Sequence, residues 1–166
     1  MTSTNQTPAT TSTIDTLDDS ALRGFVGYQL KRADLIMQQT FAREVGEPFG
    51  LRQTEFSVLV LLSANDSVKH KQISAALGVA PSNMVGVMSA LEKRKLVTRR
   101  QDPTDGRSSF WQLTDAGREL ERRASAAVRR MENNHVADET ESHRGELVEA
   151  LDRLWGSDEI EASGSS

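Results

Sequence analysis

The sequence predicts a mainly α-helical fold with one small β-hairpin. Apolar residues recur every three or four positions through most of the chain, which is the spacing of a buried helix face. Two strand-like runs, residues 96–100 and 109–113, flank a polar, charged loop, which indicates a hairpin. We therefore expect four helices, a hairpin and two more helices, with no internal repeat.

Length and composition limit the class of protein. With 166 residues, 37% of them hydrophobic, the chain fits one globular domain with a real core. The longest wholly aliphatic run, residues 58–62, is too short to span a bilayer, and no leader pattern begins the chain, so we expect a cytoplasmic protein with no membrane partner. Because cysteine is absent, disulfides, thiol catalysis and thiolate metal sites are excluded.

Charge is unevenly distributed along the chain. The net charge is -4, but residues 92–107 hold six basic side chains against three acidic ones, and acids gather after Met131. Because DNA responds first to the local field, the basic segment is the candidate for contact with nucleic acid.

The N-terminal part divides into a tail and a helix. Residues 1–17 are rich in Thr and Ser with almost nothing to bury, so we expect a disordered tail. Residues 18–48 carry an apolar stripe that predicts one long amphipathic helix, ending before Gly46 and Pro48. A helix of this length needs a partner for its apolar face.

Three helices precede the hairpin. The first spans residues 51–62, and its expected buried side chains are Phe56, Leu59, Val60 and Leu62. A short helix over residues 71–77, with Ile73, Ala76 and Leu77 on one side, ends at Gly78, and the next helix runs from Pro81 to Lys95. Two helices joined by so short a turn form a helix-turn-helix pattern.

The helix that begins at Pro81 has two different faces. Its expected buried stripe is Met84, Val87, Met88 and Leu91. The opposite face is small and polar and consists of Ser82, Gly86, Ser89 and Lys93, flanked by Asn83, Val85 and Ala90. Small side chains let a helix approach base edges closely in a major groove.

Two helices follow the hairpin. Thr114 is placed to cap the first, which has an apolar stripe of Leu120, Ala124, Ala127, Val128 and Met131. Asp138 and Glu141 resemble a capping box for the last helix, whose expected buried side is Leu147, Val148, Leu151, Leu154 and Trp155. The expected divisions are a DNA-binding lobe over residues 49–114, C-terminal helices over residues 115–155 and a disordered tail over residues 156–166.

The hairpin and the start of the next helix carry a specific motif. Asp102, Pro103, Asp105 and Arg107 are followed by Leu113, Thr114 and Gly117, which is the pattern D-P-x-D-x-R and then L-T-x-x-G. With the helix-turn-helix before it, this stretch resembles the MarR family of bacterial winged helix-turn-helix regulators. The resemblance covers residues 18–155, with two departures: Arg52 replaces the usual Ser or Thr cap, and Gly106 replaces a frequent second arginine.

The resemblance implies an architecture and a mechanism. MarR-like proteins are two-fold homodimers in which the N- and C-terminal helices form a dimerisation bundle. Such a dimer reads a pseudo-palindrome with half-sites about 34 Å apart. The resemblance also implies a cleft for small phenolic or other aromatic ligands, so our hypothesis is a repressor that a small molecule releases from DNA.

The candidate DNA contacts fall into two groups. On the recognition helix they are Ser82, Asn83, Gly86, Ser89 and Lys93, with Ser82 and Asn83 best suited to hydrogen bonds. On the wing and its approach they are Arg107, for the minor groove, and Lys95, Arg99 and Arg100, for phosphates. Because Arg99 and Arg100 alternate across a strand, only one of them faces the duplex. A plain solvated surface is the alternative interpretation of both groups.

Other kinds of site have weaker support. A ligand pocket lined by Phe25, Tyr28, Met37, Phe41 and Phe56 competes with the interpretation of these residues as ordinary core. His70, His135 and His143 form no short-spaced cluster, so we expect no metal and no cofactor. No motif of an enzyme is visible. The alternatives to a ligand-released repressor are a DNA-binding regulator or activator without an effector, and a winged-helix module that binds protein.

Overall fold

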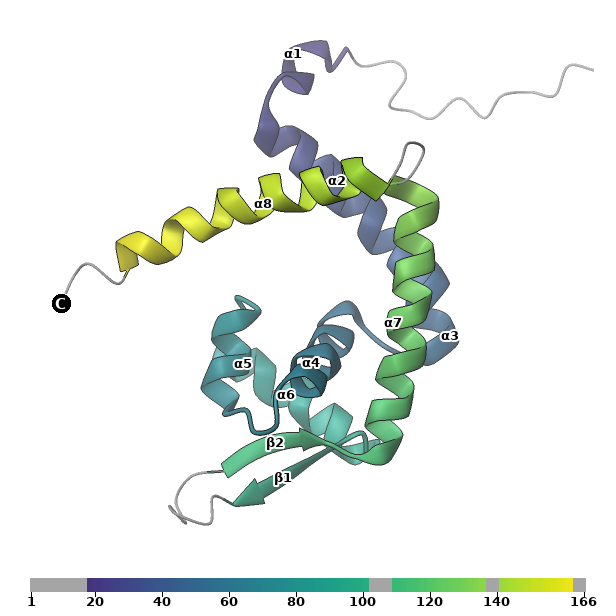
Figure 1. The fold of residues 1–166 in the computed structure, drawn as a ribbon, viewed down its shortest axis with the longest axis vertical. Coiled ribbons are helices and arrows are strands. Elements are labelled where there is room, and N and C mark those ends of the chain that lie inside the picture. The colour runs from purple at the N-terminus through teal and green to yellow at the C-terminus, as the bar shows by residue number, and fades with distance from the viewer. Residues whose placement is uncertain (1–17, 102–108, 137–140, 163–166) are drawn as a thin grey trace, which may run out of the picture. The chain divides into compact units, whose positions relative to one another are not determined.

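The computed structural model describes residues 18–101, 109–136 and 141–162. It divides into two compact units, Met1–Gln38 and Gln39–Ser166, which we call the N-terminal and C-terminal units and describe separately. The described chain is mostly helical with a two-stranded antiparallel sheet, which confirms the predicted fold class (Figure 1).

The first predicted helix is interrupted and also longer than expected. Helix α1 (Ser20–Arg23) ends at Gly24, and α2 (Val26–Phe41) begins two residues later. The helical path then continues through a π-helical turn, η2 (Ala42–Gly46), and α3 (Glu47–Phe49). The prediction of one helix ending before Gly46 was therefore wrong, because the backbone stays helical through Gly46 and Glu47, and Pro48 follows within α3.

Three helices form the core of the winged lobe in the C-terminal unit. These are α4 (Gln53–Ala64), α5 (His70–Ala76) and α6 (Pro81–Lys93). Their fully buried large side chains are Val58, Leu59, Leu62, Ile73, Met84, Met88 and Leu91. Five residues expected in this core are less buried than predicted: Phe56, Val60, Leu77 and Val87 are half-buried, and Ala76 is exposed.

The ends of these helices follow from local chemistry. Arg52, in place of a Ser or Thr cap, is extended, and its N–H donates to the Glu55 carboxylate at 2.9 Å, so the cap function passes to Glu55. Gly78 has a φ of +60° and closes α5, as its sequence position predicts.

The predicted hairpin is confirmed. Strands β1 (Val97–Gln101) and β2 (Ser109–Leu113) pair antiparallel, with Val97 opposite Leu113 and Arg99 opposite Trp111. Periodicity did not reveal a third element: Val68, in the connector before α5, bridges Trp111, whose N–H donates to the Val68 carbonyl at 2.9 Å. The hairpin is thereby fixed to the helix-turn-helix as well as to α7.

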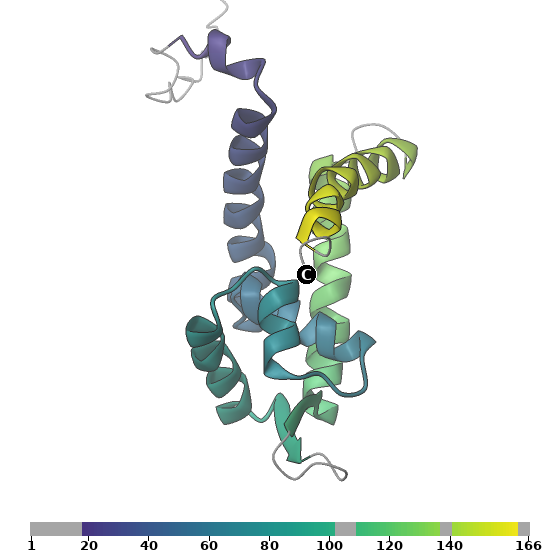
Figure 2. The same ribbon diagram turned by 90° about the vertical axis from the view of Figure 1, so that its left-hand side faces the viewer.

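Helix α7 (Asp115–Val136) starts in close contact with the hairpin, and the turned view shows the two strands beside its first turns (Figure 2). Thr114 caps α7 as predicted, because its Oγ1 accepts the Gly117 N–H at 3.0 Å. The same hydroxyl donates to the Lys95 carbonyl at 2.7 Å, so one side chain joins α7 to the end of the helix-turn-helix. Ala124, Ala127 and Met131 are buried, whereas Leu120 and Val128 are half-buried.

The last helix, α8 (Glu141–Ala162), extends beyond its predicted end at Trp155 into the segment expected to be a tail. Its expected buried residues Leu147, Val148, Leu151 and Leu154 are exposed in the single chain. Arg144 pairs with Glu132 of α7 at 2.7 Å. The side chain of Trp155, residue Asp138 and the tail 1–17 lie outside the described residues.

Gly117 is the glycine on which the fold depends most. A Cβ there would clash with the backbone carbonyl oxygen of Leu96 and lie 3.2 Å from the Leu113 side chain. We expect Gly117→Ala to lower the free energy of unfolding by about 3 kcal/mol, because the backbone at Leu96 must shift to make room for the added Cβ. Urea denaturation at one fixed protein concentration measures this change.

Gly86 provides the matched control for this substitution. It lies in α6 with no atom within 4 Å of an added Cβ. Gly86→Ala should therefore raise the free energy of unfolding by about 1 kcal/mol through helix propensity alone. Equal effects of the two substitutions would show that the close contact at Leu96 does not limit the fold.

Candidate nucleic-acid interface

Helix α6 presents one face to the core and the other to solvent. Pro81 stands in its first turn, and Met84, Met88 and Leu91 anchor it to the core. All five predicted recognition residues are exposed in the structure: Ser82, Asn83, Gly86, Ser89 and Lys93. Apart from Lys93, the side chains of this exposed face are small or short.

Helix α6 ends in a Schellman motif in which a lysine, Lys95, takes the position where glycine is usual. The Leu96 N–H bonds the Leu91 carbonyl at 3.0 Å, and the Lys95 N–H bonds the Glu92 carbonyl at 2.8 Å, which is a Schellman arrangement. Lys95 has a φ of +58°, where glycine is usual. This backbone conformation turns the chain directly into β1 and leaves the Lys95 side chain exposed.

Arg94 has an internal role. Its guanidinium donates to the Gly50 carbonyl at 2.7 Å and lies 3.7 Å from the Glu55 carboxylate. Glu55 is buried and also accepts the Arg52 N–H, so Arg94 and Glu55 together tie the end of α6 to the turn before α4. By its place in the sequence Arg94 belongs to the basic segment. No local pattern could have separated it, because its partners are more than 35 residues away.

The pairing of the strands distinguishes the two arginines of β1. Arg99 shares a face of the hairpin with Trp111, and its Nε donates to Ser109 Oγ at 2.7 Å. Arg100 lies on the opposite face, paired with Phe110. Arg107 and the other loop residues of the wing motif lie outside the described residues.

A hollow of about 360 Å³ separates α6 from the hairpin. Val85, Ser89 and Glu92 contribute from α6, and Arg99, Ser109 and Trp111 contribute from the strands. His70, at the start of α5, also lines it. Of the two arginines of β1, Arg99 is therefore the one beside the recognition helix.

The predicted ligand residues are divided between the two units, and each group is described within its own unit. In the C-terminal unit, Phe41 and Phe56 are in contact, with ring centroids 5.7 Å apart, and Phe41 is buried. Phe25, Tyr28 and Met37 belong to the N-terminal unit, where Phe25 is 64% exposed and Met37 is half-buried.

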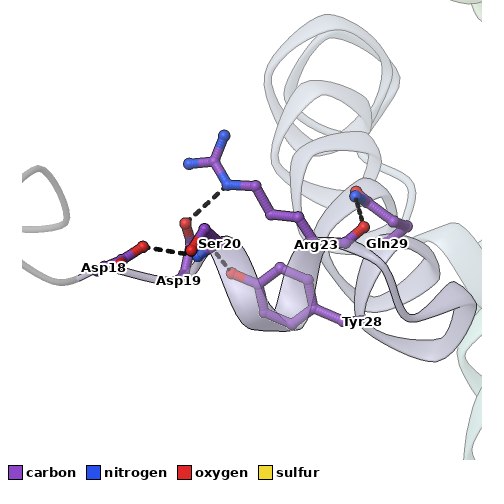
Figure 3. A network of polar contacts seen from close by, with 6 residues as sticks. All are labelled: Asp18, Asp19, Ser20, Arg23, Tyr28 and Gln29. Carbon is purple, nitrogen blue, oxygen red and sulfur yellow. Dashed lines mark hydrogen bonds and ion pairs between the residues drawn. The ribbon is translucent and has the colours of Figure 1, made fainter.

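Tyr28 takes part in a polar network instead (Figure 3). Its hydroxyl donates to Asp19 at 2.6 Å, and Arg23 Nε donates to the same carboxylate at 2.7 Å. The hydrogen bond from Tyr28, followed by that from Arg23, lowers the pKa of Asp19, and the bond to Asp19 raises the pKa of Tyr28. This network holds α1 against the start of α2, across a break that the apolar periodicity does not reveal.

The described residues contain neither a cluster suited to a metal ion nor a single helix that could span a membrane. No group of three His, Asp or Glu side chains there is arranged to hold a metal ion. Within the same residues no single helix is long and apolar enough to cross a membrane. Helices α5 and α6 reach that length and hydrophobicity only when they are taken together, and the pair is bent by 112°.

A helix-turn-helix with an exposed second helix, followed by a basic hairpin, defines a winged-helix DNA-binding protein. The sequence model of the MarR family matches residues 51–109. An HTH-type transcriptional repressor of Mycobacterium tuberculosis is 31% identical over 85% of this chain and 97% of its own length. The chain therefore belongs to the MarR family of transcription regulators, as the wing motif indicates.

Solved structures agree with this assignment. The transcriptional repressor CouR bound to a 23-mer DNA duplex is 33% identical, covers 83% of this chain and 97% of its own, and gives a TM-score of 0.77. CouR from Rhodococcus jostii bound to p-coumaroyl-CoA is 28% identical, covers 82% and 95%, and gives a TM-score of 0.74. The family is one of DNA-binding regulators, which is not an enzyme class.

We expect Tyr28→Phe to raise the pKa of Asp19 towards its usual value. The phenyl ring has no hydroxyl, so Asp19 loses the hydrogen bond that lowers its pKa most. A lowered pKa in the folded state stabilises the network above about pH 3.9, the unfolded value, and this contribution is lost as pH falls through the folded pKa. A carbon-detected NMR titration of the aspartates measures the shift. Asp18 is the internal control, since its own pKa is lowered mainly by the Ser20 backbone N–H. An unchanged Asp19 would contradict this account of the network.

Proposed function

We propose that the protein is a homodimeric repressor that binds a pseudo-palindromic operator and is released by a small aromatic ligand. The observation that carries the DNA-binding part is the exposed face of α6, where five small or polar residues lie opposite a fully buried anchor. A relative named CouR, 33% identical to this chain, has been solved both on DNA and with p-coumaroyl-CoA, which supports both halves of the proposal.

The exposed residues would contact different parts of the duplex. Ser82 and Asn83, in the first turn of α6, are placed to bond base edges. Lys93, Lys95 and Arg99 would meet phosphates, Arg99 being favoured over Arg100 because it lines the hollow beside α6. We assign Arg107 to the minor groove, where negative potential is strongest.

Dimerisation has its support in uncovered apolar surface. On α8, Leu147, Val148 and Leu154 are each about half exposed, and Leu151 is 36% exposed. Near the N-terminus, Phe25, Val26 and Ile36 are exposed as well. A second copy would remove these side chains from water, and a two-fold dimer presents two recognition helices to successive major grooves.

The ligand class follows from the relatives and from aromatic surface in this chain. The ligand-bound CouR holds an aromatic acyl thioester. Here the pair formed by Phe41 and Phe56 offers aromatic surface at the end of α2, with Phe56 half-buried in the single chain. We propose phenolic acids and their thioesters as the effector class, with Phe41 and Phe56 as the aromatic pair that contacts them.

DNA binding is tested by fluorescence anisotropy on a duplex from upstream of the protein's own gene. Arg107→Ala should weaken binding about tenfold, and Lys93→Ala should reduce the slope of log K against log salt by about 1. Arg130→Ala, an exposed substitution on α7, is the control and should stay within about twofold. If no duplex is bound even at low salt, or if neither Arg107→Ala nor Lys93→Ala differs from the wild type, the proposal is overturned.

The release step uses the same complex. Adding p-coumaroyl-CoA or p-coumaric acid should lower the anisotropy of the wild-type complex, because a ligand that prefers the DNA-incompetent state shifts the population towards it. Affinity unchanged by any compound of this class would favour a regulator without an effector.

We expect Leu151→Glu to produce monomers, since it places a charge on the apolar stripe of α8. Sedimentation velocity should show twice the mass of one chain for the wild type and for the control Glu146→Lys, which changes charge on the other side of the helix. A wild-type protein that sediments as a single chain would refute the dimer.

A further inference from the structure

Val85 is an exposed aliphatic residue on a helix whose other outward residues are small or polar. Its side chain is 59% exposed, while Met84, beside it in sequence, is completely buried. A β-branched residue also lowers helix propensity. Neither packing nor helix stability therefore explains a valine at this position.

The surroundings of Val85 favour contact with an incoming molecule. It shares one face of α6 with Ser89 and Glu92, at spacings of four and seven residues, and all three line the hollow beside the hairpin. Gly86, the next residue, has open space around it and cannot shield the valine. The isopropyl group thus stands uncovered in the first half of the helix.

Val85, Ser89 and Glu92 form one wall of the hollow, and the charges around this wall limit which part of a duplex can lie against it. Lys93 is exposed on the outward face of α6, and Arg99 lies across the hollow, so cations suited to phosphates stand on either side. The wall itself contains no cation, and Glu92 would repel a phosphate placed against it. A base edge, rather than the sugar-phosphate backbone, is the part of a duplex that suits Val85.

We propose that Val85 reads the 5-methyl group of a thymine in each half-site of the operator. The thymine methyl is the apolar feature that a base pair displays in the major groove, and it is contacted by apolar side chains. N-terminal residues of a recognition helix are those that reach base edges. This inference rests on the proposed function, and it adds a specificity-determining residue to the polar ones named above.

The test is a double-mutant cycle between protein and DNA. A duplex selected by the wild-type protein from a random-sequence pool is remade with deoxyuridine in place of each thymine in turn, which removes the methyl and keeps base pairing. At one position in each half-site, wild-type affinity should fall about fourfold per methyl removed. Val85→Ala should bind the unmodified duplex more weakly and respond less than twofold to the same deoxyuridine.

Two further variants separate this role from a general weakening. Ser82→Ala, on the same helix, should lose affinity but keep the full fourfold response to deoxyuridine. Val85→Thr, which keeps one of the two methyl groups, should keep part of that response. A fourfold response retained by Val85→Ala, or no response by the wild type at any thymine, would overturn the inference while leaving DNA binding intact. Failure to select any duplex would overturn the proposed function itself, and the inference with it.

Discussion

The contact between the start of α7 and the backbone at Leu96 sets the geometry of the winged lobe. Gly117 leaves room for the Leu96 carbonyl, and Thr114 bonds both the Gly117 N–H and the Lys95 carbonyl. The end of the recognition helix α6, the start of β1 and the start of α7 therefore meet at this contact. The angle between α6 and α7 depends on the absence of one side chain and the presence of one hydroxyl.

Local features of this lobe could be predicted from the sequence because their causes are local. Pro81 and Gly78 punctuate the helices, Thr114 caps the next one, and alternation marks the strands. The break at Gly24 was not predictable from periodicity, since the apolar spacing runs through it unchanged. The network around Asp19 holds α1 and α2 together, and it depends on Tyr28, which lies nine residues from Asp19.

The candidate site was predicted in part for the same reason. Helical spacing alone separated the exposed face of α6 from its buried anchor. It could not choose between Arg99 and Arg100, because that choice depends on strand register and on a hollow formed by α6 and the hairpin together. Val68 joins the sheet through a bridge to Trp111, which is 43 residues further along the chain and has no signature in the sequence around either residue.

The hydrogen bonds of Arg94 have a consequence for how operator preference evolves. They attach the end of the recognition helix to the carbonyl of Gly50, at the turn that follows α3. Gly50 adopts a φ of +61°, so most replacements there would reshape the turn and carry the helix end with it. Substitutions that retune which DNA is read need not touch DNA. A selection for altered operators should therefore be expected to return changes at the turn after α3 as well as at the interface.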